Sequence, residues 1–343
     1  WTELRARLSP SPLLDGYKEL QDKNGLVLFH HAQSPVDLLQ LRTVEDVFYV
    51  IERLPKIEWG REGLTQIYEA MARNRTLEAG VEMLHWLRPR ARKALSTFRV
   101  ITRMAGSKQP YRRMDLEQAV SEGLRKRAPH GKWRAVREGE DIEIWVNLVG
   151  FDFICGLRLS DETMRHREYK AAHIEASLRP SVAASMAWLA EPQSDDVFLD
   201  PLCGAGTVLI ERALFGRHRM LLGGDLNGDA LQAAVDNFGP RHKPRQLFRW
   251  DARRLPLAAQ SVTKIATNLP FGVKIGSHAE NPALYADFFR EAERVLAPGG
   301  RVVVLSSEAE LIKATLRRQG LYIVEGHWVT LLGRRAAIYV IKR

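Results

Sequence analysis

Four consecutive residues in the last quarter of the chain could orient a nitrogen nucleophile. Residues 262–267 form an apolar run that predicts a buried strand, and Asn268-Leu269-Pro270-Phe271 follows it directly. The Asn268 amide oxygen and a neighbouring backbone carbonyl could both accept from an exocyclic amino group and keep electron density on its nitrogen. Phe271 offers a flat face for stacking a base, while Pro270 restricts the backbone of Leu269 to extended conformations. We therefore predict a catalytic loop made of Asn268, Leu269, Pro270 and Phe271.

A second group of residues could hold a ligand through backbone amides. Residues 196–200 predict a strand that ends at Asp200, and Gly204 and Gly206 follow it before a helical segment. A tight glycine turn between a strand and a helix lets the main chain approach a ligand that side chains would block. The residue three positions after Gly206 is Leu209. A dinucleotide fingerprint would have a third glycine there, so a nicotinamide cofactor is disfavoured.

Two further carboxylates follow predicted strands. Asp225 ends the predicted strand at 220–225, about 20 residues after the glycines, where a ribose diol would lie. Asp251 follows the predicted strand at 246–250, where an adenine amino group could donate to it. The predicted cofactor-binding residues are Asp200, Cys203, Gly204, Ala205, Gly206, Thr207, Asp225, Leu226, Asp251, Ala252 and Asn268.

These residues occupy strand ends in a repeating pattern of strands and helices. After a helix at 181–189, we expect strands at 196–200, 220–225, 246–250, 262–268, 301–306, 321–326 and 336–342, with helices in most of the gaps. Such alternation predicts an α/β fold with a parallel, doubly wound sheet, which binds ligands beyond the carboxyl ends of its strands.

The first 160 residues have a different pattern. Apolar residues at 26–29 and a periodic segment at 36–54 predict a small α/β unit. Beyond it we expect helices within 61–95 and at 115–127, and strands at 98–102, 141–148 and 151–159, which together predict an α+β module. A polar segment then reads as a linker. The predicted domains are therefore an N-terminal part at 1–60, a module at 61–160, a linker at 161–180 and an α/β domain at 181–343.

Length and charge distribution support this division. With 343 residues and 45% hydrophobic composition, the chain exceeds the usual size of a single core. Its formal net charge is +10, yet residues 85–137 alone carry 15 lysines and arginines against three acidic residues. A solvated face is the alternative, but this concentration favours a surface that binds a polyanion. Predicted phosphate contacts are Arg112, Arg113, Arg125, Lys126, Arg127, Lys132 and Arg134, with Tyr111 and Trp133 as candidate stacking partners.

Several classes of protein and site are disfavoured. No apolar run approaches the roughly 18 residues that cross a bilayer, and the first residues lack the apolar centre of a signal peptide. Cys155 and Cys203 show neither a disulfide framework nor metal-ligand spacing, and the ten histidines match no metal pattern. Methylation of a pyrimidine carbon would require a cysteine nucleophile. Neither cysteine lies beside the predicted catalytic loop in the sequence. We expect a cytoplasmic monomer with no metal and no membrane contact.

Two motifs together carry a family resemblance. DPLCGAGT at 200–207 and NLPFG at 268–272 resemble the S-adenosylmethionine-dependent amino-methyltransferases that modify bases in RNA and DNA. The commoner pattern in those enzymes is Asn-Pro-Pro followed by Phe or Tyr. Leu269 replaces the first of these prolines and restores one backbone NH.

The wider layout resembles the THUMP-domain tRNA guanine-N2 methyltransferases. HREYKAAHIEASLRPSVAASM at 166–186 is similar to their junction sequence. The resemblance implies a Rossmann-like, seven-stranded class I methyltransferase domain at 181–343 that uses S-adenosylmethionine. It also implies a ferredoxin-like part at 1–60 and a THUMP domain at 61–160 that grips tRNA, often near its 3′ end.

The leading hypothesis is therefore an enzyme that forms N2-methylguanosine in tRNA. An amino-methyltransferase acting on ribosomal RNA or DNA is the nearest alternative. A catalytically idle RNA-binding scaffold is a third, but a scaffold has no physical need for the combination of Gly204, Gly206, Asp225, Asn268 and Phe271.

Overall fold

The chain folds into two compact units. The computed structural model describes residues 1–20, 24–32, 35–88, 97–127, 133–172, 174, 177–271, 279–331 and 333–343. The N-terminal unit comprises Trp1–Leu41 and Asp46–Met164, and the C-terminal unit comprises Arg42–Glu45 and Arg165–Arg343. The change of unit after Met164 falls inside the predicted linker at 161–180. Nothing in the sequence patterns indicated that residues 42–45 belong with the C-terminal unit.

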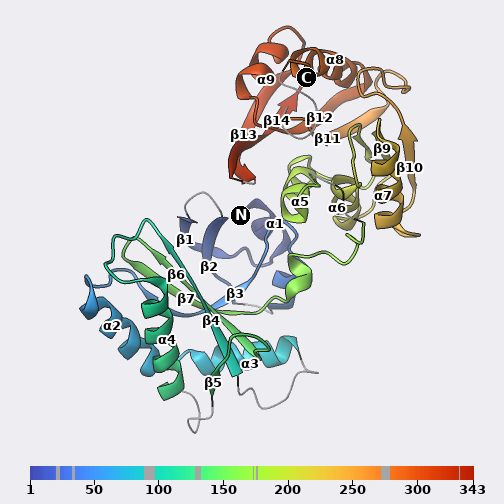
Figure 1. The fold of residues 1–343 in the computed structure, drawn as a ribbon. Helices are drawn as coiled ribbons and strands as arrows, with labels where there is room; N and C mark the ends of the chain where they lie inside the picture. The colour runs from blue at the N-terminus through green and yellow to red at the C-terminus, as the bar shows by residue number, and fades with distance from the viewer. Residues whose placement is uncertain are drawn as a thin grey trace. The chain divides into compact units, whose positions relative to one another are not determined.

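A seven-stranded sheet forms the centre of the C-terminal unit (Figure 1). In spatial order its strands are β10 (Arg245–Arg249), β9 (Met220–Asp225), β8 (Val197–Asp200), β11 (Val262–Asn268), β12 (Leu296–Ser306), β14 (Arg334–Lys342) and β13 (Tyr322–Leu331). The first five run parallel to one another. Strand order reverses between β8 and β11, which creates the switch point where doubly wound folds bind ligands. The expected seven-stranded, Rossmann-like fold is confirmed.

The last two strands correct one expectation, because the sheet is not parallel throughout. β14 runs antiparallel to both β12 and β13. β13 extends to Leu331 and β14 begins at Arg334, so only a short connection joins them. A parallel pair needs a crossover of about a dozen residues or more. The hairpin therefore forces the reversal of direction.

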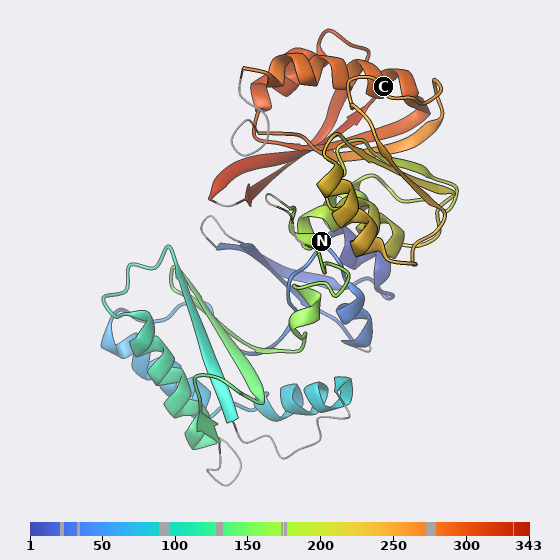
Figure 2. The ribbon, with the colours of Figure 1, turned by 45° about the vertical axis from the view of Figure 1, so that its right-hand side comes forward.

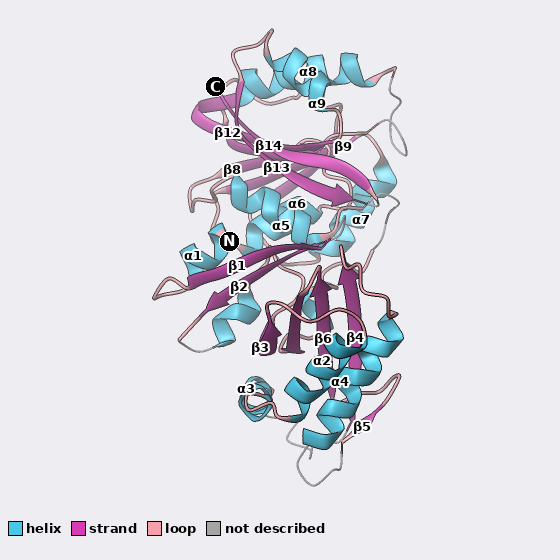
Figure 3. Cartoon of the chain, turned by 90° about the vertical axis from the view of Figure 1, so that its left-hand side faces the viewer, coloured by secondary structure: helices cyan, strands magenta, loops and turns pink. Residues whose placement is uncertain are grey.

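Helices cover both faces of this sheet and give three layers (Figure 2 and Figure 3). On one face lie α5 (Pro180–Leu189), α6 (Thr207–Leu214) and α7 (Gly228–Phe238); on the other lie α8 (Asn281–Val295) and α9 (Ala309–Leu316). Successive strand residues enter opposite layers, so Val303 packs with the α5–α7 cluster and Val304 with the α8–α9 cluster. Burial on both faces explains why the central strands β8, β9 and β12 are rich in apolar residues.

The N-terminal unit contains a five-stranded sheet and a separate hairpin. In spatial order the sheet has β3 (Phe48–Leu54), β7 (Asp152–Arg158), β6 (Ile142–Val149), β4 (Thr97–Ala105) and β5 (Arg134–Ala135), and the hairpin has β1 (Leu13–Leu20) and β2 (Asn24–His30). β3 pairs with β7, so this sheet crosses the predicted boundary at residue 60. The sequence patterns gave no strand at β1.

Helices complete the N-terminal unit. They are α1 (Thr2–Arg7), α2 (Arg61–Ala72), α3 (Leu77–Leu87) and α4 (Arg113–Arg127), with 3₁₀ turns at Pro35–Gln40 and Glu162–Met164. α2 and α4 lie side by side (Figure 1 and Figure 3). Gly123 permits this close approach, because a Cβ there would lie 2.6 Å from the Cβ of Met71 and 2.8 Å from the carbonyl oxygen of Tyr68.

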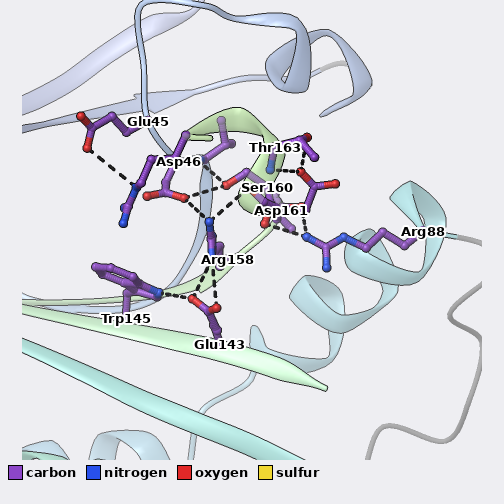
Figure 4. Close-up of polar contacts among 12 residues, drawn as sticks. Glu45, Asp46, Arg88, Glu143, Trp145, Arg158, Ser160, Asp161 and Thr163 are labelled. Atoms are coloured by element: carbon purple, nitrogen blue, oxygen red, sulfur yellow. Dashed lines mark hydrogen bonds and ion pairs between the residues drawn. The ribbon is translucent and has the colours of Figure 1, made fainter. Parts of the chain in front are cut away.

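A network of polar side chains centred on Arg158 fixes one end of the five-stranded sheet (Figure 4). Arg158 Nη1 donates to Glu143 Oε1 at 2.9 Å, and Arg158 Nη2 pairs with Asp46 Oδ1 at 2.8 Å. Ser160 Oγ donates to the same Asp46 oxygen at 3.2 Å, and Arg88 donates to the Ser160 carbonyl at 2.6 Å. The network joins β6, β7, the start of β3 and the end of α3, so we assign it a structural role.

Candidate active site

The predicted cofactor-binding residues lie along the carboxyl edge of β8, β9 and β10, and Asn268 ends the neighbouring strand β11. Parallel register aligns these ends: Asp200 is paired with Gly223, and Asp225 with Arg249. Four strand ends therefore converge at one edge of the sheet, as the sequence patterns predict.

The turn between β8 and α6 has a backbone that its glycines permit. Gly204 has φ +51° and Gly206 has φ +77°, in the left-handed region that residues with a Cβ rarely adopt. Gly206 is also the N-cap of α6, so the first amides of this helix are directed into the turn. A Cβ on Gly206 would lie 3.2 Å from the Cβ of Ala234 and from the Phe238 ring. The turn therefore fits an anionic or polar ligand bound through main-chain NH groups.

The Asp225 carboxylate ties the glycine turn to the next loop. The Gly204 NH donates to Asp225 Oδ2 and the Asn227 NH donates to Asp225 Oδ1, each at 2.9 Å. Asp225 is half-buried, and each carboxylate oxygen carries two lone pairs. Asp225 can therefore hold the turn in place and still accept from a ribose hydroxyl.

Asp200 connects the glycine turn to the predicted catalytic loop. Thr267 Oγ1 donates to Asp200 Oδ1 at 2.7 Å, and the Leu202 NH donates to the same oxygen at 3.3 Å. Burial raises the pKa of the Asp200 carboxyl to about 7, although the Thr267 hydrogen bond opposes this shift. Because Thr267 directly precedes Asn268, this contact links the two halves of the site.

Cys203, Ala205 and Thr207 are also buried, so their side chains pack into the C-terminal unit. The carbonyl of Ala205 accepts from Asn237 Nδ2 at 3.1 Å. The Asn237 amide also exchanges two hydrogen bonds with the backbone of Ala172, at 2.8 and 3.1 Å. Asn237, which the sequence patterns did not single out, thereby connects the turn to the junction segment.

Trp250 is a second residue of this edge that the sequence patterns missed. Its indole lies so close to Gly224 that a Cβ on that glycine would come within 1.8 Å of Trp250 Nε1. The same nitrogen donates to the Pro201 carbonyl at 3.1 Å. Trp250 therefore locks the end of β10 against the two preceding strand ends. Gly224, near the end of β9, was the signal that could have pointed to Trp250. A glycine inside a strand marks a position that a neighbouring group approaches closely.

The other predicted cofactor contacts have contrasting environments. Arg253 binds the Asp251 carboxylate, with Nη2 2.7 Å from Oδ2, and this hydrogen bond lowers the pKa of Asp251. Leu226 is 59% exposed, whereas Ala252 is buried. Leu226 thus offers apolar surface at the edge, Asp251 shares its carboxylate with an arginine, and Ala252 contributes to the core.

The Asn268 side chain carries a hydrogen-bond acceptor that a bound ligand could satisfy. Its Oδ1 atom is buried and has no hydrogen-bond partner among the described residues. A buried oxygen without a donor is costly, so a ligand amino group would explain its position. The NH of Leu269 donates to the Leu305 carbonyl at 3.1 Å. A proline at this position could not make that bond, which gives the leucine a structural reason.

The Pro270 carbonyl is anchored from α8. Tyr285 Oη donates to it at 2.9 Å and Asn281 Nδ2 donates to it at 3.1 Å. Tyr285 and Asn281 are four residues apart, on one face of the helix, and both are buried. Phe271 is partly buried against the α5–α7 cluster, which leaves part of its ring accessible, and Gly272 lies outside the described residues. The sequence patterns did not identify Tyr285 or Asn281.

The predicted RNA-binding residues belong to the N-terminal unit. Those exposed are Arg112, Arg113, Arg125, Lys126 and Arg134. Arg125 and Lys126 lie at the end of α4 near β5, which carries Arg134, while Arg112 and Arg113 lie at the other end of the helix (Figure 1). The structure therefore divides these cations between two ends of α4.

Four aromatic or basic residues in this group need comment. Arg127 pairs with Glu78 and donates to a backbone carbonyl, so it is engaged within the unit. Trp133 is buried, with its ring 6.0 Å from that of Phe98, and therefore offers no face for stacking. Tyr111 is half-buried beside a groove of about 700 Å³ between α2 and α4. Lys132 lies outside the described residues.

Two kinds of feature are absent from the described part of the chain. No helix there combines the length and apolarity that a membrane span requires. No group of three or more His, Cys, Asp or Glu residues there is arranged to hold a metal ion.

Comparisons with known proteins agree with this geometry. Residues 167–337 match the family described as "RMKL-like, methyltransferase domain". The chain is 30% identical over 273 residues to mouse "tRNA (guanine(6)-N(2))-methyltransferase THUMP3", a match that covers 75% of this chain and 53% of that protein. It is 32% identical to "tRNA (guanine(6)-N2)-methyltransferase" of Thermus thermophilus, over 64% of this chain and 65% of that one. The chain thus spans about half the length of its mammalian relatives.

A solved structure extends the similarity over both units. TrmN from Thermus thermophilus superimposes with a TM-score of 0.78 and 25% sequence identity, and the match covers 100% of this chain and 95% of that one. The order of elements along the whole chain is therefore that of a known protein.

Proposed function

We propose that this chain, whose residues 167–337 match an RMKL-like methyltransferase domain, transfers a methyl group from S-adenosylmethionine to the N2 amino group of a guanosine in tRNA. The observation that carries the proposal is the buried, unpartnered Oδ1 of Asn268 at the carboxyl edge of the sheet. An exocyclic amino group would supply the missing donor. The glycine turn and Asp225 lie on the adjoining strand ends, where the methyl donor would be held.

The residues of the catalytic loop have separate roles in this reaction. The amino nitrogen of guanine is a weak nucleophile, because its lone pair is delocalised into the ring. Asn268 Oδ1 accepts a hydrogen bond from one amino hydrogen, and the neighbouring Leu269 carbonyl accepts one from the other. These two hydrogen bonds reduce the delocalisation of the lone pair into the ring and keep it on the nitrogen. The Pro270 carbonyl cannot easily take the second role, because Tyr285 and Asn281 already donate to it.

Bound S-adenosylmethionine supplies an electrophilic methyl group on a positively charged sulfur. The amino nitrogen would take the methyl group as the bond between that carbon and sulfur breaks, with S-adenosylhomocysteine as the leaving group, and would afterwards release one proton to solvent. Asn268 cannot accept that proton, so it positions the nucleophile and is not a general base. Phe271 provides the surface on which the extruded base stacks.

A tRNA substrate is supported by the names of the relatives and by the charge of the N-terminal unit. Mouse and bacterial relatives are described as tRNA guanine-N2 methyltransferases. The exposed cations on and beside α4 fit phosphate contacts. We assign the N-terminal unit a THUMP-type role in gripping tRNA, in a cytoplasmic, monomeric enzyme.

The decisive test is nucleoside mass spectrometry of unmodified tRNA treated with the protein and S-adenosylmethionine, followed by fragment mapping. We expect N2-methylguanosine at a defined position. Ribosomal RNA and duplex DNA, treated in parallel, are the competing substrates. Methylation of either in preference to tRNA would contradict the proposal, as would any methylated base other than N2-methylguanosine.

Asp225→Ala is expected to weaken S-adenosylmethionine binding by about 10- to 100-fold. The substitution removes a charge-assisted hydrogen bond to the ribose, which contributes about 1.5 to 3 kcal/mol, and it also releases the Gly204 NH. Isothermal titration calorimetry gives the Kd. Asp236→Ala, which removes an exposed carboxylate on α7, is the matched control and should bind like the wild type. An unchanged Kd in well-folded Asp225→Ala would exclude the ribose role.

Reversing the exposed charge of α4 should selectively weaken the interaction with tRNA. The variant carries Arg112→Glu, Arg113→Glu, Arg125→Glu and Lys126→Glu. Because each lost phosphate contact lowers the salt dependence of binding, both the affinity for tRNA and the slope of log affinity against log salt should fall. S-adenosylmethionine affinity should not change. Filter binding at several salt concentrations measures both quantities; an unchanged slope would place the RNA contacts elsewhere.

A further inference from the structure

Trp328 is a large aromatic residue exposed at the end of the C-terminal sheet. It lies on β13 and is 60% exposed. The guanidinium carbon of Arg335, on β14, lies 4.1 Å from the centre of the indole ring. Arg335 and its neighbour Arg334 are also exposed, and neither forms an ion pair with an acidic residue in the described parts of the chain. A tryptophan held in water beside an exposed arginine that forms no ion pair in the described parts of the chain is more typical of a binding surface than of a core.

The strand register places this pair at the edge that carries the catalytic loop. Ser306, the last residue of β12, pairs with Ala337 on β14, and Ala337 pairs with Trp328 on β13. On the other side of β12, Leu305 pairs with Asn268, so Leu269 lies in the same row as Ser306.

Trp328 and Leu269 are therefore separated by three strand spacings, or roughly 14 Å. Residues 329–331 and 334–336 continue past the end of β12, and Figure 2 shows the β13–β14 hairpin, in red, projecting from the sheet. The pair thus lies beside the active site, on the carboxyl side of the sheet, without touching the reacting group.

The chemistry of the pair matches single-stranded or unstacked RNA. Aromatic rings and guanidinium planes both stack with bases, and arginine also binds phosphate. A base extruded into the site carries its neighbouring nucleotides with it, and these must cross the surface beside the catalytic loop. The positive charge of Arg334 and Arg335 is complementary to their phosphates.

We propose that Trp328 and Arg335 contact the nucleotides that flank the target guanosine. The two side chains stack with the flanking bases, and the charge of Arg335 neutralises their phosphates. This inference rests on the proposed function, since it assigns part of the same RNA substrate. Trp328 and Arg335 are positioning residues, because they act on neighbouring nucleotides while Asn268 acts on the target base.

The test compares Trp328→Ala, Trp328→Phe and Arg335→Gln in the full chain, with an unmodified tRNA transcript as the substrate. Trp328→Ala should raise KM for tRNA about tenfold and leave kcat at saturating tRNA within about twofold. Trp328→Phe retains a stacking ring and should recover most of the loss. Arg335→Gln should raise KM and reduce the salt dependence of tRNA affinity by about one contact.

Two control variants occupy the other end of the same sheet. Tyr322→Ala removes an exposed aromatic from β13 beside Lys342, far from the carboxyl edge. Arg318→Gln removes an exposed charge that follows α9. Both should retain wild-type KM. Unchanged affinity for S-adenosylmethionine in every variant would show that the C-terminal unit remains folded.

A photo-crosslinking experiment separates this proposal from the proposed function. A tRNA transcript carrying 4-thiouridine in place of uridine is irradiated with the wild-type chain, and cross-linked peptides are identified by mass spectrometry. We expect a cross-link in the peptide that contains Trp328, even if no methyl transfer is observed. Wild-type KM in Trp328→Ala, together with no cross-link on that peptide, would overturn the proposal and favour a protein partner for this surface.

Discussion

Asn268→Ala is expected to lower the single-turnover rate of methyl transfer about 100-fold, the effect typical of removing one preorganised hydrogen-bonding group from a transition state. The side chain ends β11 with a buried oxygen that has no hydrogen-bond partner in the part of the chain that the structure describes, and alanine removes that acceptor without removing a ladder hydrogen bond of the strand. The amino lone pair then stays delocalised into the base. Rapid-quench measurement at saturating S-adenosylmethionine and tRNA isolates this step from binding.

Two observations control this experiment. The Kd for S-adenosylmethionine should remain close to that of the wild type, because the contacts of Asp225 with Gly204 and Asn227 are untouched. Asn268→Asp retains an acceptor oxygen of the same reach and should therefore lose less activity than Asn268→Ala. A wild-type rate for Asn268→Ala would show that the reaction takes place at another site.

Glu211→Gln should produce the largest loss of stability. Glu211 lies on α6, just after the glycine turn, and is fully buried. Arg42 Nε donates to one of its oxygens at 2.5 Å, and Tyr169 Oη donates to the other at 2.6 Å. Arg167 lies 3.6 Å from the same carboxylate. The glutamine removes the negative charge that faces two largely buried arginines, so we expect a loss of about 3 to 5 kcal/mol.

Urea unfolding measures this loss, with hydrogen exchange of α6 peptides used to identify the transition of the C-terminal unit. Glu310→Gln breaks an exposed pair with Lys313 on α9 and is the matched control, expected to leave stability unchanged. Equal urea midpoints of unfolding for Glu211→Gln and the wild type would mean that the interactions of the Glu211 carboxylate contribute no net stability. Because α6 begins at the glycine turn, where we propose that S-adenosylmethionine binds, the affinity for S-adenosylmethionine should fall together with stability.

Much of the C-terminal architecture follows from local sequence patterns. The central strands are rich in apolar residues because they are buried on both faces, and glycines and acids mark several strand ends. The antiparallel direction of β14 and the extension of β13 to Leu331 were not visible, because apolar alternation specifies a strand but not the direction of its partner. β1 was missed for a related reason: its residues are mostly exposed, so little apolar periodicity remains.

The same distinction applies to the site. Gly204, Gly206, Asp225 and Asn268 were predictable because local chemistry requires those residue types directly after a strand. Their positioning partners were not. Tyr285 resembles any buried aromatic on an amphipathic helix, yet its hydroxyl fixes the Pro270 carbonyl.

Contacts between residues distant in the chain depend on how the whole unit packs. Arg42 and Glu211 are 169 positions apart, and nothing around either residue specifies the other. Trp328 shares a row of the sheet with Leu269 through two intervening strands, a relation set by register and strand order. Local patterns report how a segment buries its own apolar face. Which buried charge meets which partner depends on the packing of the whole unit, because burial makes each unpaired charge too costly to leave alone.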